Sequence, residues 1–267
     1  MEVQGDSAVS VIDRDGVAIS FEVHGDATDS IPLLLSHGFG ASSAMWEPNV
    51  AALSQNRRVI TWDLRGHGRS ASPDDPAQYS QAASVEDISA VLDVCGVEKA
   101  VVGGLSLGGY LSLAFHLVHP ERVGALLLFD TGPGYKDDAA RQRWNSWALA
   151  RADSFDSEGL AALGTSPEVN VGPHDPKGLA SAARGILTQQ TSDVIRSLPE
   201  IQVPALVLVG SHDRPFLAAA DYIAARISTA TKMVIGNAGH SSNIDQPAAF
   251  NTAVVGFLDT LNQLGSE

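Results

Sequence analysis

Short runs of β-branched residues and leucine alternate along the chain with longer segments in which apolar residues recur at helical spacing. This alternation is typical of a mainly parallel β-sheet covered by helices on both faces. The short runs predict eight strands, at Ala8 to Ile12, Val17 to Val23, Ile31 to Leu35, Arg58 to Trp62, Ala100 to Gly103, Ala125 to Phe129, Ala205 to Val209 and Lys232 to Ile235. The helical spacing predicts helices near Ala44 to Leu53, Ser84 to Val94, Leu107 to Val118, Phe216 to Ala225 and Ala248 to Leu264.

One long segment between the sixth and seventh predicted strands breaks this alternation. It has no convincing strand, and its helix-like stretches run from Asp138 to Ala152 and from Lys177 to Gln189. We therefore expect an all-helical cap inserted into an α/β core. The expected division is a core of residues 1–131 and 200–267 and a cap of residues 132–199.

Composition narrows the classes of partner and compartment. A chain of 267 residues with 44% hydrophobic residues can bury a substantial core, while a net charge of -14 without a Lys or Arg run disfavours nucleic acid and anionic membranes. The single cysteine, Cys95, excludes an intramolecular disulfide and suits a reducing compartment. Met1 to Asp6 lacks the features of a signal peptide, and no apolar run is long enough for a membrane span. We expect a cytoplasmic protein with a small-molecule ligand, either monomeric or homodimeric.

The most informative motif is Gly103-Gly104-Leu105-Ser106-Leu107-Gly108-Gly109, between a predicted strand and a predicted helix. A serine on such a sharp turn is held in a strained conformation, and the flanking glycines let strand and helix approach closely. The helix N-terminus also directs free N–H groups at the site where an oxyanion would form. This context favours a nucleophilic Ser106 over a serine that only caps a helix. No Lys-Ser or Lys-Thr pair follows, so a phosphate-binding loop is disfavoured.

Four further motifs follow predicted strands in order: His37-Gly38-Phe39-Gly40, Asp63-Leu64-Arg65-Gly66-His67-Gly68-Arg69-Ser70, Gly210-Ser211-His212-Asp213-Arg214-Pro215 and Asn237-Ala238-Gly239-His240. With the serine turn, they make the chain resemble the α/β-hydrolase superfamily from about Val17 to Leu264. The resemblance implies an α/β-hydrolase fold with an eight-stranded, mostly parallel sheet and a helical cap. Its bacterial members include enol-lactonases with similar motifs and compact caps.

The resemblance also implies roles for particular residues. Ser106 would be the nucleophile and His240 the general base, in the chain order Ser, Asp, His. Asp213 would orient the base, although some relatives use an acid at the position of Asp130. The backbone N–H groups of Phe39 and Leu107 would form the oxyanion hole.

The remaining motif residues are expected to be structural. The turn that contains His67 is used for packing in this superfamily. Neither a metal site nor a cofactor is expected, because the proposed chemistry needs only side chains and water.

Several reactions are compatible with a serine at this turn. Hydrolysis of a small ester or lactone through an acyl-enzyme is the first expectation, and the alternatives are a C–C bond hydrolase of the meta-cleavage type, a cofactor-free haloperoxidase or perhydrolase, and a receptor with slow turnover. Cap arginines that could bind a dienoate carboxylate are Arg141, Arg143 and Arg184. Trp144 and Trp147, three residues apart, would share a helical face and line the substrate pocket, or only anchor the cap.

Overall fold

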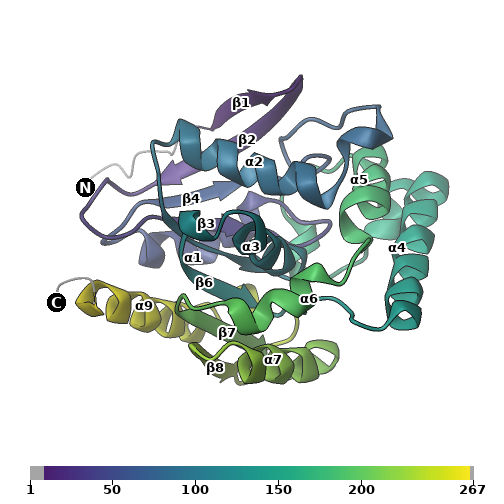
Figure 1. Cartoon of the computed structure of the whole chain (residues 1–267). Helices are drawn as coiled ribbons and strands as arrows, with labels where there is room; N and C mark the ends of the chain where they lie inside the picture. Colours follow the sequence, from purple (N-terminus) through teal and green to yellow (C-terminus); the bar gives the residue numbers. More distant parts are fainter. Residues whose placement is uncertain (1–8, 265–267) are drawn as a thin grey trace.

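The computed structural model describes residues 9–264 and contains one eight-stranded sheet in the order β1-β2-β4-β3-β5-β6-β7-β8 (Figure 1). The strands are β1 Ser10–Arg14, β2 Val17–His24, β3 Leu33–Ser36, β4 Val59–Trp62, β5 Ala100–Leu105, β6 Val123–Phe129, β7 Ala205–Gly210 and β8 Ala230–Ile235. Only the pairings of β2 with β1 and with β4 are antiparallel. The predicted mostly parallel sheet is therefore confirmed. Ala8, the expected start of the first strand, lies outside the described residues.

Helices cover both faces of the sheet. They are α1 Glu47–Leu53, α2 Gln81–Val94, α3 Leu107–Val118, α4 Asp138–Glu158, α5 Pro176–Ala182, α6 Asp193–Ser197, α7 Arg214–Arg226, α8 Ser242–Asp245 and α9 Pro247–Leu264. Apolar residues of α2, α3 and α7 form the core on one face, and those of α1 and α9 form the core on the other. Within residues 9–264, none of the helices combines the length and apolarity needed to cross a membrane.

α2 and α4 extend furthest beyond their predicted ends, α2 because of a local cap and α4 because of a tertiary contact. α2 begins at Gln81 because the Ser80 hydroxyl accepts a hydrogen bond from the Ala83 N–H at 3.0 Å and caps the helix three residues early. α4 continues past Ala152 to Glu158 because its last turns bury Phe155, whose ring packs edge-on against Phe39 at 6.1 Å between centroids. A capping hydroxyl and a single aromatic contact thus set boundaries that apolar periodicity did not indicate.

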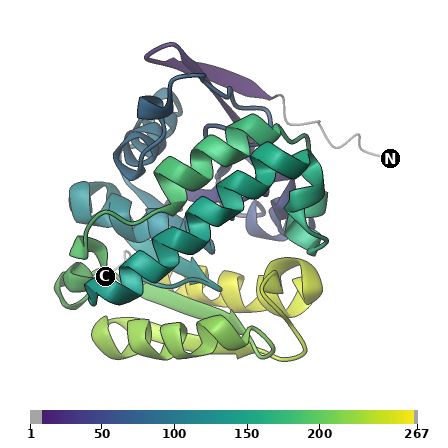
Figure 2. The same cartoon turned by 90° about the vertical axis from the view of Figure 1, so that its right-hand side faces the viewer.

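All the regular secondary structure between β6 and β7 is helical. α4 and α5 pack side by side across one end of the sheet (Figure 2) and share a separate apolar cluster that includes Phe155 and Leu179. Phe39, from the loop after β3, packs against this cluster, so the helical layer lies over the carboxyl end of that strand. The layer also contributes to the main core, through Val194 and Ile195 of α6, Ala148 of α4 and Ala182 of α5.

The sheet has a topological switch point between β3 and β5. These two strands are hydrogen-bonded neighbours, yet the chain reaches β4 on one side before it returns to β5 on the other. Ser36 pairs in register with Gly104 near the carboxyl ends of the two strands. Ligands bind at such points in open α/β sheets, since the loops that follow the two strands diverge and leave a crevice.

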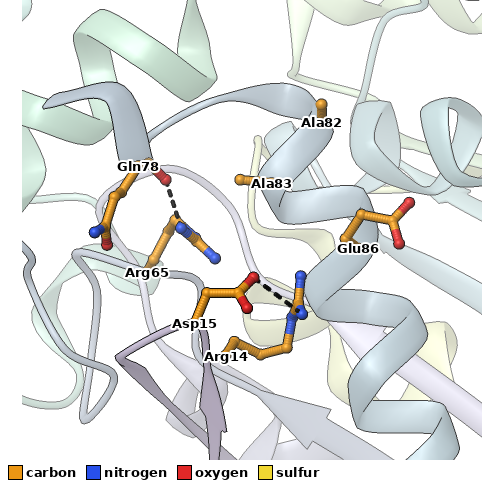
Figure 3. A pocket seen from close by; sticks show the side chains of 7 residues that line it. All are labelled: Arg14, Asp15, Arg65, Gln78, Ala82, Ala83 and Glu86. Atoms are coloured by element: carbon orange, nitrogen blue, oxygen red, sulfur yellow. Dashed lines mark hydrogen bonds and ion pairs between the residues drawn. The ribbon is translucent and has the colours of Figure 1, made fainter.

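A buried ion pair ties the turn after β4 to α2. Arg65 binds Asp87 in a bidentate manner, with Nε to Oδ2 at 2.8 Å and Nη2 to Oδ1 at 2.7 Å. The side chain of Asp87 is fully buried and that of Arg65 is 5% exposed. Arg65 and Arg14 also line a polar hollow of about 260 Å³, in which Arg14 pairs with Asp15 and Arg65 donates to the Gln78 carbonyl (Figure 3). Because these arginines already have acidic or carbonyl partners, the hollow has a structural role.

Replacing Asp87 by alanine should lower the free energy of unfolding by about 3–5 kcal/mol, because it leaves the Arg65 charge buried without its carboxylate. Urea unfolding followed by circular dichroism measures this change. The matched control is Asp93→Ala, which removes the 64% exposed carboxylate that pairs with Arg122 at 2.7 Å. That surface pair should contribute less than about 1 kcal/mol, and equal effects of the two substitutions would contradict the prediction.

Candidate active site

Ser106 occupies the tight turn between β5 and α3. Its φ of 55° lies in the left-handed region, which a non-glycine residue adopts only when the surroundings compel it. Two contacts hold the turn: the Ser106 N–H donates to the Phe129 carbonyl at 2.9 Å, and the Thr131 hydroxyl donates to the Ser106 carbonyl at 2.6 Å. The residue is half-buried and directly follows the last residue of β5.

The glycines beside Ser106 are required by close packing. A Cβ at Gly104 would lie 2.7 Å from the carbonyl carbon of Gly108, and one at Gly108 would lie 2.8 Å from the His37 carbonyl oxygen. Both separations are shorter than side chains tolerate, so strand, helix and the β3 loop meet here only because these residues lack side chains. The predicted strand, turn and helix around Ser106 are thus confirmed.

His240 and Asp213 are joined by a direct hydrogen bond. His240 Nδ1 lies 2.8 Å from Asp213 Oδ2, and the Asp213 side chain is 4% exposed. Asp213 directly precedes α7, and the Phe216 ring of that helix stacks on His240 with centroids 4.8 Å apart and planes at 29°. The imidazole is therefore held on one edge by a carboxylate and on one face by an aromatic ring.

Asp130, the rival acid, has different partners. Its Oδ1 accepts from the Gly210 N–H at 2.7 Å and its Oδ2 accepts from the Ser242 hydroxyl at 2.5 Å. Burial raises the pKa of Asp130 to about 7, against the opposing influence of these two hydrogen bonds. Asp130 therefore fixes the loop after β8 to the end of β6, and Asp213 is the carboxylate in contact with His240.

The serine and the histidine lie on loops that are tied to each other. Ser242, two residues after His240, bonds to Asp130, which directly follows the Phe129 that accepts the Ser106 N–H. Among residues 9–264, no hydrogen bond joins the Ser106 hydroxyl to the His240 ring. Catalytic hydrogen bonds are often long in unliganded enzymes and shorten when substrate binds.

Two backbone N–H groups lie near Ser106. Leu107 is the first residue of α3, so its N–H has no partner within the helix. The turn after β3 is closed by the Ala41 N–H, which donates to the Gly38 carbonyl at 3.1 Å. The N–H of Phe39, inside this turn, takes no part in that bond. A Cβ at Gly38 would lie 3.5 Å from Ser106 Cβ, so the backbone before Phe39 passes directly beside the serine.

The two buried histidines near this loop support its backbone. His37 Nδ1 contacts the Gly38 carbonyl at 2.7 Å, and its Nε2 accepts from the Leu64 N–H at 3.0 Å. The His67 ring packs against those of His37 and Phe39, and burial together with the nearby His37 lowers the pKa of His67 to about 3. Both rings are neutral packing elements rather than charged groups.

The model of the family described as "Alpha/beta hydrolase family" matches residues 33–253. The chain belongs to this α/β hydrolase family. A curated relative, 3-oxoadipate enol-lactonase 2 of Acinetobacter baylyi, is 28% identical across 92% of this chain and 95% of the relative. The 2-hydroxymuconate semialdehyde hydrolase of Pseudomonas putida is 31% identical across 90% of this chain and 92% of the relative.

Among solved structures, a thermophilic esterase from Thermogutta terrifontis is 26% identical, covers 96% of this chain and 99% of its own, and superposes with a TM-score of 0.80. These comparisons confirm the expected fold and the expected resemblance to enol-lactonases. The chain is therefore an α/β-hydrolase enzyme. Its relatives are named after different substrates, so family membership does not identify the substrate.

Trp144 and Trp147 of this α/β hydrolase lie on α4. The Trp144 indole donates to the Leu187 carbonyl at 2.8 Å and its ring lies 6.0 Å from that of Tyr135. The Trp147 ring, 50% exposed, packs against Trp144 at 4.8 Å with the planes tilted by 39°. These contacts connect α4 to the helical turn Ala183–Leu187. Trp144 also packs against the main core, as expected of an anchor, whereas a role of either tryptophan in substrate binding stays a prediction.

One buried carboxylate near the site was not among the predicted residues. Glu168 lies in the helical turn Pro167–Asn170, between α4 and α5, and is 6% exposed. Its Oε2 accepts a hydrogen bond from the hydroxyl of Ser241, the residue after His240. A single glutamate in a polar stretch has no sequence signal of burial, because its position depends entirely on how the helical layer packs.

Proposed function

We propose that this α/β hydrolase cleaves small carboxylic esters or lactones through an acyl-enzyme formed on Ser106. The observation that carries the proposal is the 2.8 Å bond between His240 Nδ1 and Asp213 Oδ2, beside a serine held at a φ of 55°. The bond fixes the tautomer that leaves Nε2 free to accept a proton. The family's named lactonases, hydrolases and esterases support the same type of reaction.

The chemistry follows from this arrangement in two steps. The Ser106 oxygen attacks the ester carbonyl while its proton passes to His240 Nε2, and the alcohol then leaves with that proton. Water next attacks the acyl-enzyme, gives a proton to His240, and releases the acid as Ser106 regains its hydrogen. In both steps the N–H groups of Phe39 and Leu107 would stabilise the negative oxygen, because they are oriented before charge develops. In a lactone, the acid and the alcohol leave as one molecule.

The pH dependence of this reaction should reflect the surroundings of His240. Burial lowers its pKa, but the hydrogen bond and charge of Asp213, with smaller contributions from Asp130 and Glu168, raise the pKa above its ordinary value of 6.5. Because the base must be neutral, kcat/KM should fall with decreasing pH around a midpoint above 6.5. A profile of kcat/KM from about pH 5 to 9 measures this midpoint, and a midpoint below the ordinary histidine value would contradict the assignment.

A chain-length series of p-nitrophenyl esters tests the proposed function. Acetate, butyrate and octanoate esters should be hydrolysed by the purified wild type, with the short acyl chains favoured by a site that the helical layer covers. Absence of turnover in folded protein would exclude the general esterase. Substrates of C–C hydrolases, peroxide-dependent activity and slow ligand binding would then be measured.

A C–C bond hydrolase is the second candidate, because the Pseudomonas putida relative is named a 2-hydroxymuconate semialdehyde hydrolase. Two of the three cap arginines expected to bind a carboxylate offer limited support. Arg184 pairs with Asp153 and Asp156, and Arg141 pairs with Asp138, while Arg143 is exposed. Arginines with such partners are poorer anchors for an anionic substrate, so ester or lactone hydrolysis is the proposal favoured here.

A further inference from the structure

Glu168 brings a carboxylate from the helical layer to the loop that carries His240. Its two oxygens each accept a hydroxyl hydrogen bond, Oε1 from Ser166 at 2.7 Å and Oε2 from Ser241. Each oxygen of the carboxylate thus has a hydroxyl donor. With 6% of its surface exposed, Glu168 places this charge where water screens it weakly.

The position of this carboxylate is at the site rather than on the outside of the layer. Ser241 directly follows His240, and the charge of Glu168 contributes to raising the pKa of that histidine. The next residue, Val169, packs in the same apolar cluster as Phe39, which follows β3. The turn Pro167–Asn170 therefore contacts both the loop that carries His240 and the loop expected to form the oxyanion hole.

Within residues 9–264, no ion pair compensates the charge of Glu168. Arg184 pairs with Asp153 and Asp156 instead. Arg151 donates to the Leu163 carbonyl at 2.8 Å. His174, in the loop after this turn, has its pKa lowered by burial and is uncharged at neutral pH. The site therefore has a negative field from the layer above it.

We propose that Glu168 is a specificity-determining residue that selects substrates by charge. It disfavours acyl groups that carry a carboxylate and favours neutral or positively charged esters and lactones. The inference rests on the proposed function for the identity of the reacting bond. Its physical basis is repulsion between a buried anion and a second anion in the same weakly screened site. By this inference the substrate differs in charge from 3-oxoadipate, the compound in the name of one relative.

Two esters of equal acyl length test the proposal: p-nitrophenyl valerate, which is neutral, and mono-p-nitrophenyl glutarate, which ends in a carboxylate. The wild type should prefer the valerate in kcat/KM. Glu168→Gln keeps the shape and one oxygen acceptor, so the ratio of the two kcat/KM values should fall about tenfold, mainly because the glutarate improves. The matched control is Glu158→Gln, an exposed carboxylate on the same layer, which should leave the ratio unchanged.

A binding measurement keeps the test independent of turnover. Phenylboronic acid and 4-carboxyphenylboronic acid form a bond from the Ser106 oxygen to boron as the hydroxyl proton passes to His240. The ratio of their two dissociation constants, measured by titration calorimetry, should shift in Glu168→Gln in the same direction as the ester ratio.

The outcomes separate the two proposals. A shift in the boronic acid ratio without turnover of either ester would support charge selection and contradict ester hydrolysis. Unchanged ratios in Glu168→Gln, or an equal loss for both members of each pair, would overturn charge selection and leave Glu168 a structural role.

Discussion

Ester hydrolysis by the Ser106→Ala protein is expected to fall by about 10⁴-fold or more, close to the rate left by the oxyanion hole and binding alone. In the proposed mechanism, the substitution removes the oxygen that would bond to the acyl group at the turn between β5 and α3. Burst kinetics with p-nitrophenyl butyrate measure the effect, because the wild type should release one equivalent of nitrophenol at acylation.

The control for this substitution is the stability of the turn itself. Alanine must adopt the same φ of 55°, so the variant should be folded and at most slightly less stable. Circular dichroism and urea unfolding check this. A Ser106→Ala protein that retained a tenth or more of the activity would contradict the nucleophile assignment, whereas a protein that kept ligand affinity and had no turnover in either form would fit the receptor alternative.

Asp213→Asn should reduce kcat by about 10³–10⁴-fold, while Asp130→Asn should reduce it by less than about tenfold. In the first variant an amide faces His240 Nδ1 and favours the wrong tautomer. In the second variant the amide oxygen still accepts from the Gly210 N–H, and the Ser242 hydroxyl can turn to accept from the amide N–H. The two substitutions replace the same type of carboxyl group at buried positions near the same histidine, which makes each the control for the other.

Steady-state kinetics of both variants near pH 8 provide the comparison. A larger loss in Asp130→Asn than in Asp213→Asn would reverse the assignment of the acid. A second readout is the acid limb of the pH profile, which should move to lower pH in Asp213→Asn because that carboxylate both bonds to the imidazole and attracts its positive charge.

Sequence alone was sufficient for the strands and for the turn at Ser106, because both depend on local signals. Buried parallel strands are short apolar runs, and the glycines at positions 104 and 108 are required by backbone contact. For the acid, the sequence favours Asp213 over Asp130 only through the resemblance to the superfamily. The choice depends on which carboxylate meets the histidine ring, and that contact joins residues 27 positions apart in the chain.

The helical layer was the least predictable part. α4 has few apolar residues, and its end at Glu158 depends on the contact between Phe155 and Phe39. The burial of Glu168 is harder still to predict, because it follows from a hydrogen bond to Ser241, 73 residues away in the chain. Long-range packing of polar segments produces no periodic pattern of apolar residues in the sequence. Glu168, which we propose to select the substrate, could therefore not be predicted.

The place where the layer joins the sheet has a consequence for divergence among relatives. β6 and β7 are adjacent, hydrogen-bonded strands, so the chain leaves the sheet after Phe129 and re-enters it at the next position. Changes within residues 132–191 can therefore leave every strand pairing in place, provided that the residues of this segment in the main core, Ala148, Ala182, Ile186 and Leu187, keep their packing. Ser106 would stay with the sheet in such relatives, whereas the residue at the position of Glu168 could be acidic, neutral or basic.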